Sequence, residues 1–157
     1  MTEPQPSAHH TVSAMKIPQL SVFLENRPGS LLPPLQLLAE AGLNLAGLSL
    51  ADTAQFGILR LVLRDWARAR ELLERGGWVV KLNDMVAIDV DDAPGGLVRA
   101  LEVLTAAGKD IEYMYAFYLR RDGRVVLLFR FDDPDGAIAA LDDAGIAMLP
   151  ARVLLGE

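Results

Sequence analysis

The chain carries one pattern twice, and this internal repeat limits the folds that are open to it. A Pro-Gly pair is followed by leucines and then by Ala-Gly: Pro28-Gly29, Leu31, Leu35, Leu38 and Ala41-Gly42. The positions recur 66 residues later as Pro94-Gly95, Leu97, Leu101, Leu104 and Ala107-Gly108. Leucines at positions i, i+4 and i+7 share one face of a helix, and glycine suits the turn that ends it. Each copy therefore predicts an amphipathic helix at the same place.

Strand patterns surround both predicted helices. Apolar residues alternate before each helix, at 20–24 and 86–90, and two strand-like runs follow each one, at 43–50, 56–63, 111–118 and 125–131. The Arg-Asp-Gly run at 121–123 indicates a hairpin and makes the later offset 68 residues. Asp65 and Asp133 are expected to cap helices that end near residues 75 and 144. Each copy then closes with a strand, at 78–82 and 148–155.

The order strand, helix, strand, strand, helix, strand predicts an α+β fold of two ferredoxin-like modules. In each module, two helices would cover one face of a four-stranded antiparallel sheet. We expect the first module at 15–83 and the second at 84–157. Residues 1–14 are polar, contain two prolines and show no apolar period, so we expect a disordered leader there. The only histidines, His9 and His10, lie in this leader, and two adjacent histidines do not complete a metal site.

Composition excludes several classes of function. The net charge is −6, which disfavours binding to the phosphates of nucleic acid. The apolar runs are far shorter than the roughly 20 residues of a membrane-spanning helix. The absence of cysteine excludes disulfides and thiolate metal sites and suits a cytoplasmic protein. No histidine, cysteine or phosphate-binding glycine loop stands in the predicted modules, so we expect no catalytic activity and no cofactor.

The loop before the first helix is the strongest candidate for a ligand site. A helix start offers unpaired N–H groups and a partial positive charge, which suit a carboxylate. Gly29 allows a close approach to the backbone, and the available donors are the amides of Gly29, Ser30, Leu31 and Leu32. The same residue types also form ordinary turns before capped helices, and the residues alone leave both interpretations open.

The run LENRPGSL at 24–31, with AGLNL from position 41, resembles the ACT domain family. In particular, it is similar to the serine-sensing ACT module of phosphoglycerate dehydrogenase. The resemblance implies an amino acid held at an interface between modules by loop amides and by two asparagines 18 residues apart, here Asn26 and Asn44. That module has a histidine where this chain has Leu24, which favours a larger or less polar ligand than serine. We therefore predict a ligand site formed by the following residues: Asn26, Arg27, Pro28, Gly29, Ser30, Leu31, Asn44 and Asp52.

Asp52 and Thr53 follow the second predicted strand, where they either bind an ammonium group or form a turn. In the second copy, Asp92 and Asp110 stand in place of the two asparagines, so the copies are not expected to be equivalent sites. Two carboxylates would repel a ligand carboxylate but attract an amino group or a cation, and they could equally serve as helix caps or loop residues.

We predict a second site or an interface at the following residues: Asp92, Gly95, Gly96, Leu97, Asp110, Tyr113 and Tyr115. Tyr113, Tyr115 and Phe117 alternate along one strand. They either line a pocket or pack between sheets or subunits.

The runs at 51–63 and 111–117 resemble stand-alone bacterial proteins with tandem ACT domains. This resemblance implies an amino-acid-binding regulatory or sensor protein. The alternative is a regulatory subunit of a biosynthetic enzyme, similar to the small subunit of acetohydroxyacid synthase, whose second half does not repeat the Pro-Gly motif. We expect a homodimer, because the sheet edges and the aromatic stripe need cover.

Overall fold

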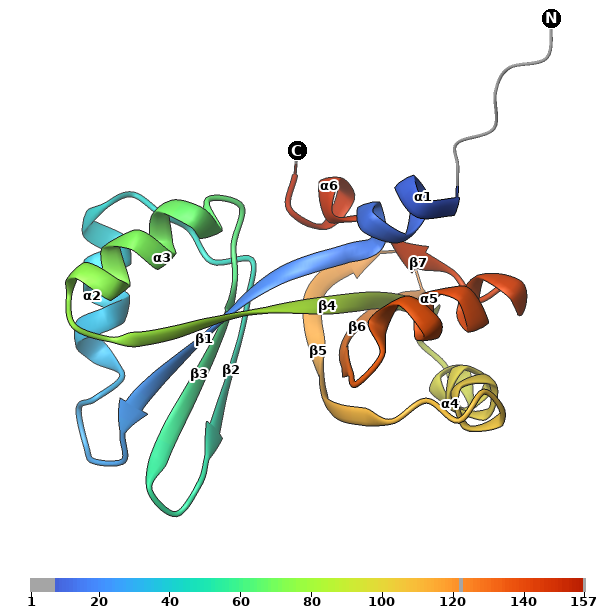
Figure 1. The fold of residues 1–157 in the computed structure, drawn as a ribbon, viewed down its shortest axis with the longest axis horizontal. Helices are drawn as coiled ribbons and strands as arrows, with labels where there is room; N and C mark the ends of the chain where they lie inside the picture. The colour runs from blue at the N-terminus through green and yellow to red at the C-terminus, as the bar shows by residue number, and fades with distance from the viewer. Residues whose placement is uncertain (1–7, 122, 157) are drawn as a thin grey trace, which may run out of the picture. The chain divides into compact units, whose positions relative to one another are not determined.

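A computed structural model describes residues 8–121 and 123–156 (Figure 1). The elements follow the chain as α1 (Ala8–Met15), β1 (Lys16–Glu25), α2 (Leu32–Glu40), β2 (Gly47–Asp52), β3 (Phe56–Val62), α3 (Trp66–Arg75), β4 (Val79–Asp91), α4 (Gly96–Ala106), β5 (Ile111–Arg121), β6 (Arg124–Phe131), α5 (Pro134–Asp143), β7 (Met148–Leu149) and α6 (Ala151–Leu154). No helix in the described ranges is long and apolar enough to cross a membrane.

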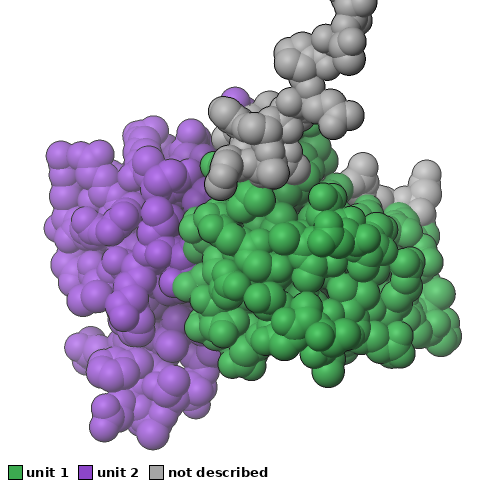
Figure 2. All heavy atoms as spheres, turned by 45° about the vertical axis from the view of Figure 1, so that its right-hand side comes forward, with its two compact units in different colours: residues 1–17, 84–154 green, residues 18–83, 155–157 purple. Residues whose placement is uncertain are grey.

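The chain divides into two compact units, shown in purple and green in Figure 2. We call Pro18–Asn83, with Leu155, the first module, and Asp84–Leu154, with the residues up to Ile17, the second module. The division falls within β4, which is one continuous strand of 13 residues. The two strands that we expected at 78–82 and 86–90 are therefore one.

The first module consists of strands in the order β2-β3-β1-β4 with α2 and α3 on one face (Figure 1). Strands β1 and β3 are antiparallel, with Leu20 opposite Leu61 and Val22 opposite Leu59. Opposite residues share a face of the sheet, so this register places all four side chains under the helices. All four are fully buried. The predicted helical stripe also faces this core, with Leu38 buried and Leu31 and Leu35 partly buried.

The second module repeats this arrangement with the order β7-β4-β6-β5, and α4 and α5 lie together on one face (Figure 1). Its core contains Val86, Ile88 and Leu127, and the rings of Phe129 and Phe131 stack with centroids 5.6 Å apart. The predicted α+β class with ferredoxin-like modules is thus confirmed. The hairpin turn lies between β5 and β6, where Gly123 adopts a left-handed φ of 65°. Its Asp122 lies outside the described residues.

Helix α1 covers residues 8–14, where we expected a disordered leader. Val12 and Met15, one helical turn apart, pack against the core of the second module. Helix α1 also contacts α5 and α6. Val12 and Met15 form an apolar face on this helix, although the segment as a whole is polar. Residues 1–7 lie outside the described part of the chain.

The closing strand predicted at 148–155 is also wrong after its first two residues. Strand β7 ends at Leu149, and the short helix α6 follows. Pro150 has no N–H group with which to continue a β-ladder. Its carbonyl oxygen instead accepts hydrogen bonds from the amides of Val153 and Leu154, at 3.0 and 3.2 Å. The apolar residues after Pro150 therefore form a helical turn in place of the expected strand.

The strand predicted at 43–50 begins later than expected. The amide of Leu43 bonds to the carbonyl of Leu38 at 3.0 Å, which completes the end of α2, and β2 starts only at Gly47. Asn44 consequently lies in the connection between α2 and β2.

Helix α1 provides the first prediction. Replacing Val12 with alanine should lower the free energy of unfolding by roughly 1 kcal/mol, because two methyl groups leave a half-buried contact. The melting temperature should fall by about 2–4 °C. Ser13→Ala is the control, because Ser13 is exposed on the same helix. Equal melting temperatures for the two variants would show that α1 is not docked.

The two helix caps provide the second prediction. Asp133 accepts a hydrogen bond from the amide of Gly136 at 3.1 Å, whereas its repeat counterpart Asp65 makes no capping bond. Asp133→Ala should therefore lower the melting temperature more than Asp65→Ala does.

The difference in melting temperature between wild type and Asp133→Ala should also depend on pH. The Gly136 amide, followed by the Lys109 ammonium 2.9 Å away, lowers the pKa of Asp133 below its usual value. A lowered pKa in the folded state contributes stability that is complete above the ordinary aspartate pKa of about 3.9. This stability is lost as the pH falls through the lowered value. A gap between wild type and Asp133→Ala that stays constant down to pH 2 would contradict this account.

Candidate functional site

The loop between β1 and α2 closes on itself through backbone hydrogen bonds. The amide of Ser30 bonds to the carbonyl of Arg27 at 3.3 Å, and that of Leu32 to Gly29 at 3.4 Å. Gly29 adopts a left-handed φ of 83°, which favours glycine. Two of the four predicted amide donors are therefore used within the turn. The amides of Gly29 and Leu31 take part in none of the turn hydrogen bonds of the described residues.

Asn26 joins this loop to the turn between β2 and β3. Its side-chain amide donates to Oδ1 of Asp52 at 2.8 Å and to the carbonyl oxygen of Thr53 at 3.3 Å. The Thr53 hydroxyl in turn donates to the carbonyl of Phe56 at 3.0 Å. Asn26 and Asp52, 26 positions apart in sequence, thus stand side by side, as the prediction that both belong to one site requires.

A pocket of about 140 Å³ opens beside this contact. Six of the eight predicted ligand residues line it: Asn26, Arg27, Gly29, Ser30, Leu31 and Asp52. The remaining wall is provided by the first-module strands, including Leu24 and Leu50. A water molecule needs roughly 10–15 Å³ of such volume, so the pocket has room for a small organic molecule. Pro28 and Asn44 do not line it.

One polar atom of this loop has no partner. The Oγ atom of Ser30 is buried and makes no hydrogen bond to any described residue. A buried hydroxyl without a partner costs roughly 1–3 kcal/mol. Arg27, by contrast, forms an ion pair with Glu25 at 2.9 Å, with both side chains more than two-thirds exposed. The net stabilisation from such an exposed pair is small.

Asn44 lies at the opposite end of α2 from Asn26. It lines a different pocket, of about 300 Å³, together with Gly42, Arg64 and Asp65. The nine residues of α2 separate the two asparagines by roughly 13 Å of helix. Within a single first module, the two side chains therefore cannot hold one small ligand.

The corresponding loop of the second module has the same backbone conformation but different side chains. Gly95 has a φ of 86°, close to that of Gly29. Gly96 takes the place of Ser30, and a Cβ atom there would clash with the carbonyl oxygen of Asp91. Asp92 and Asp110 are both exposed, and the amide of Asp92 bonds to the carbonyl of Gly123 at 2.9 Å.

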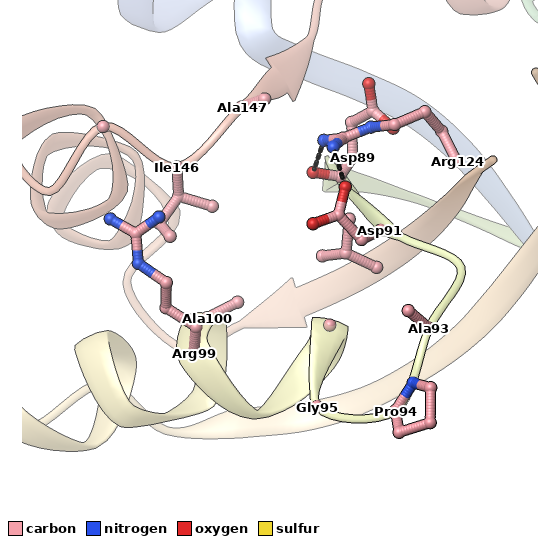
Figure 3. A pocket seen from close by; sticks show the side chains of 13 residues that line it. Asp89, Asp91, Ala93, Pro94, Gly95, Arg99, Ala100, Arg124, Ile146 and Ala147 are labelled. Atoms are coloured by element: carbon pink, nitrogen blue, oxygen red, sulfur yellow. Dashed lines mark hydrogen bonds and ion pairs between the residues drawn. The ribbon is translucent and has the colours of Figure 1, made fainter. Parts of the chain in front are cut away.

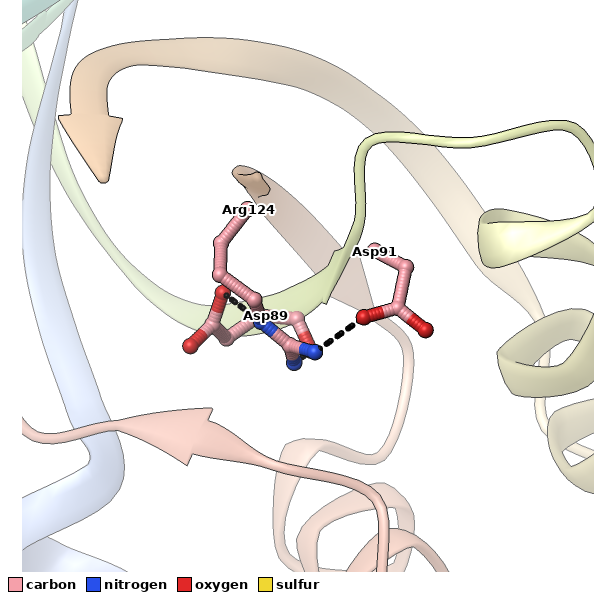
Figure 4. Close-up of polar contacts among 3 residues, drawn as sticks. All are labelled: Asp89, Asp91 and Arg124. Atoms are coloured by element: carbon pink, nitrogen blue, oxygen red, sulfur yellow. Dashed lines mark hydrogen bonds and ion pairs between the residues drawn. The ribbon is translucent and has the colours of Figure 1, made fainter. Parts of the chain in front are cut away.

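A pocket of about 400 Å³ lies beside this second loop, and it gathers four charged side chains (Figure 3). Arg124 from β6 bonds through Nε to Oδ1 of Asp89 at 3.2 Å and through Nη2 to the carbonyl of Asp89 at 2.9 Å. Its Nη1 contacts Oδ1 of Asp91 at 2.5 Å (Figure 4). Arg99, on α4, donates to the carbonyl of Ala144 at 3.1 Å. We call this pocket the charged groove.

Of the residues predicted for a second site, only Gly95 and Gly96 line the charged groove. Tyr113 and Tyr115 lie half-buried on β5, and Phe117 is buried. Neither tyrosine nor Asp92, Leu97 or Asp110 belongs to its lining.

The first module has a groove of about 380 Å³ at equivalent positions. With the repeat offsets of 66 and 68 residues, its Phe23 corresponds to Asp89, and its Phe56 to Arg124. Trp78 likewise corresponds to Ile146. The Lys81 ammonium lies 5.5 Å from the centre of the Phe23 ring. Sequence reasoning missed both grooves, although aligning the two copies beyond the loop would have shown the exchange of aromatic for charged residues.

Comparison with known proteins agrees with this architecture. A model of the ACT domain pair matches residues 15–147. The structure of protein BT0572 from Bacteroides thetaiotaomicron has 34% sequence identity and a TM-score of 0.83, and the match covers 90% of this chain and 97% of that one. No curated protein matches the sequence.

More distant structures share the fold alone. The regulatory subunit of aspartate kinase from Thermus thermophilus, solved in its ligand-free form, has 17% identity and a TM-score of 0.59 over 84% of this chain and 95% of that chain. The subunit from Thermus flavus has 18% identity and a TM-score of 0.57 over 83% and 94% of the two chains. The family match spans both modules described above, and the chain belongs to the ACT domain pair family.

Proposed function

We propose that this protein is a cytoplasmic amino-acid sensor without catalytic activity, and that its ligand binds in the pocket between the β1–α2 loop and the end of β2. The observation that carries the proposal is the meeting of Asn26 and Asp52 beside two amides at a helix start. An α-amino acid presents a carboxylate and an ammonium group about two bonds apart. A site for it needs an anion-binding and a cation-binding group close together.

The pocket has both kinds of group. The amides of Gly29 and Leu31 immediately precede α2, where the helix dipole favours a negative charge. Asp52 uses one carboxylate oxygen to hold Asn26, and its carboxylate charge attracts an ammonium group. Leu24 and Leu50 add apolar wall for a side chain. In this arrangement, Ser30 Oγ gains a hydrogen-bond partner when its side chain rotates toward the ligand.

A homodimer would complete this site. Strand β2 is the edge strand of the first module, and its Leu48 and Leu50 are about half exposed, at 51% and 55%. Antiparallel pairing with β2 of a second copy would give hydrogen-bond partners to the backbone N–H and C=O groups of this edge and would bury both leucines. It would also place the start of one β2 beside the end of the other. Asn44 of the second copy, three residues before its β2, would then approach Asn26 and Asp52.

The alternative role is that of a regulatory subunit, in which the same pocket controls an associated enzyme. The shared fold with aspartate kinase regulatory subunits supports it only at the level of architecture. Purification of the tagged chain from its native host distinguishes the two roles. A catalytic subunit recovered in equal amount supports the subunit role, and recovery of the chain alone supports the stand-alone sensor.

The ligand proposal predicts the outcome of a thermal-shift screen with the twenty standard amino acids. At 100 times its dissociation constant, a ligand of the folded state adds about 2.7 kcal/mol, which raises the melting temperature by several degrees. Asn26→Ala should cost roughly 1–3 kcal/mol of binding, because it leaves polar groups of the ligand and of Asp52 unmatched. Asp92→Ala, at the equivalent position of the second module, is the matched control and should bind as wild type does.

Ser30→Ala separates stability from binding. It should leave the melting temperature of the free protein unchanged or higher, because it removes a buried hydroxyl without a partner. It should weaken ligand binding. Should no amino acid shift the melting curve at millimolar concentration, the sensor proposal is wrong. Should Asn26→Ala bind as well as wild type, the ligand lies elsewhere.

The dimer is tested by sedimentation. Wild type should have about twice the mass of the 17.1 kDa chain at micromolar concentration. Leu48→Lys should shift it toward monomer and weaken amino-acid binding, since a charge on the edge strand opposes pairing. Val98→Lys, on a similarly exposed valine of α4, should do neither. A monomeric wild type would contradict the dimer.

A further inference from the structure

The charged groove of the second module has no role in the function proposed above. We infer that it is a second amino-acid site, which takes a zwitterionic α-amino acid through Arg99 on one side and Asp91 on the other. It extends the proposed sensor function to a different place in the chain. It uses neither the Asn26 pocket nor the aspartates that replace the two asparagines.

The repeat supplies an internal control for the importance of these charges. The first module forms the equivalent groove with Phe23 and Phe56 where the second has Asp89 and Arg124. The strand register is also equivalent, with Glu25 opposite Phe56 and Asp91 opposite Arg124. The fold therefore does not require an ion pair at these positions.

Maintaining the ion pair has a cost. The side chain of Asp89 is only 13% exposed and that of Arg124 is 34% exposed. Withdrawing such ions from water is unfavourable, and apolar side chains of similar size often give equal or greater stability. The first module, with Phe23 and Phe56, shows that aromatic side chains fit at these two positions of the fold. A role in binding, which apolar residues could not fill, accounts for the charges in the second module.

The two arginines keep donors for a ligand. A guanidinium has five N–H donors, and Arg124 uses three of them on Asp89 and Asp91. Two carboxylate-containing residues thus fix the plane of its guanidinium. Arg99 uses one donor, on the carbonyl of Ala144, and has no carboxylate partner among the described residues. It therefore brings to the groove a positive charge that forms no ion pair with a described residue.

The carboxylate for the opposite end of the ligand comes from Asp91. Its side chain is 70% exposed, and one of its oxygens contacts Arg124. Figure 3 shows Arg99 and Asp91 on opposite sides of the open space, one rising from α4 and the other from the end of β4. A ligand carboxylate placed toward Arg99 and a ligand ammonium placed toward Asp91 would each meet the opposite charge.

Net charge and shape favour a zwitterion over a simple anion. Arg99 and Arg124 balance Asp89 and Asp91, so the groove as a whole favours a ligand with no net charge. The remaining walls include Val90, Ala100 and Ile146, which suit an aliphatic side chain. The volume of about 400 Å³ accommodates a complete amino acid.

The test is isothermal titration calorimetry of the full-length protein with each of the twenty L-amino acids. At least one should bind with an affinity that falls tenfold or more in both Arg99→Gln and Asp91→Asn. That affinity should remain within twofold of wild type in Arg152→Gln, which removes an exposed arginine of α6. Because Arg99 and Asp91 are exposed, both groove variants should melt as wild type does.

The outcomes separate this inference from the proposed function. If Asn26→Ala alone removes all amino-acid binding, the inference is overturned and the first-module site stands. If the groove variants alone remove it, the inference is supported and the first-module site is wrong. If a carboxylic acid that lacks the ammonium group binds as tightly as the amino acid, the groove binds anions and the assignment to zwitterions is overturned. If no amino acid binds at millimolar concentration, both sites are wrong.

Discussion

Each module depends on the burial of one face of its sheet beneath two helices. In the first module, this burial fixes the register of β1 against β3, because a shift of one residue would move Leu20 and Val22 to the face of the sheet that points away from the helices. The register in turn fixes where β1 ends. The chain must then turn within six residues, from Asn26 to Leu31, to lay α2 on the same face. Gly29 makes this turn possible, and the unused amides of the loop follow from it.

The two modules show how one backbone can hold different chemistry. Gly29 and Gly95 adopt nearly the same conformation, so the loops have similar paths. Several side chains that line the equivalent grooves differ in polarity. Phe23 and Phe56 become Asp89 and Arg124. The shared core maintains the fold in both copies, which leaves the ends of the strands free to differ. A pair of modules can thereby present two distinct pockets in one short chain.

The sequence predicted the elements that arise from repeated apolar spacing. The two leucine stripes, the strands beside them and the left-handed glycines follow from patterns that local sequence determines. The helix at Ala8–Met15 does not, because only its contacts with the second core distinguish Val12 and Met15 from residues of a polar tail. The short strand β7 depends on the single residue Pro150, which interrupts an otherwise apolar run.

The candidate site was only partly predictable, because it too depends on contacts between residues that are distant in the sequence. The loop motif predicted Asn26 and the loop amides as ligand-binding groups, and the family resemblance predicted Asn44. The contact of Asn26 with Asp52 depends on how the β2–β3 turn meets the loop, and spacing alone could not show that Asn44 lies at the far end of α2. The charged groove could not be predicted from local patterns, because its four charged residues are spread over 36 positions, from Asp89 to Arg124.

The central claim is that an amino acid binds at the start of α2 in the first module. Nuclear magnetic resonance of the isotope-labelled protein tests it most directly, by following backbone amide shifts during a titration with the amino acid that stabilises the protein. The account predicts saturable shifts for the amides of Gly29 and Leu31 and for the side-chain amide of Asn26. Saturable binding that leaves all three signals in place would contradict it.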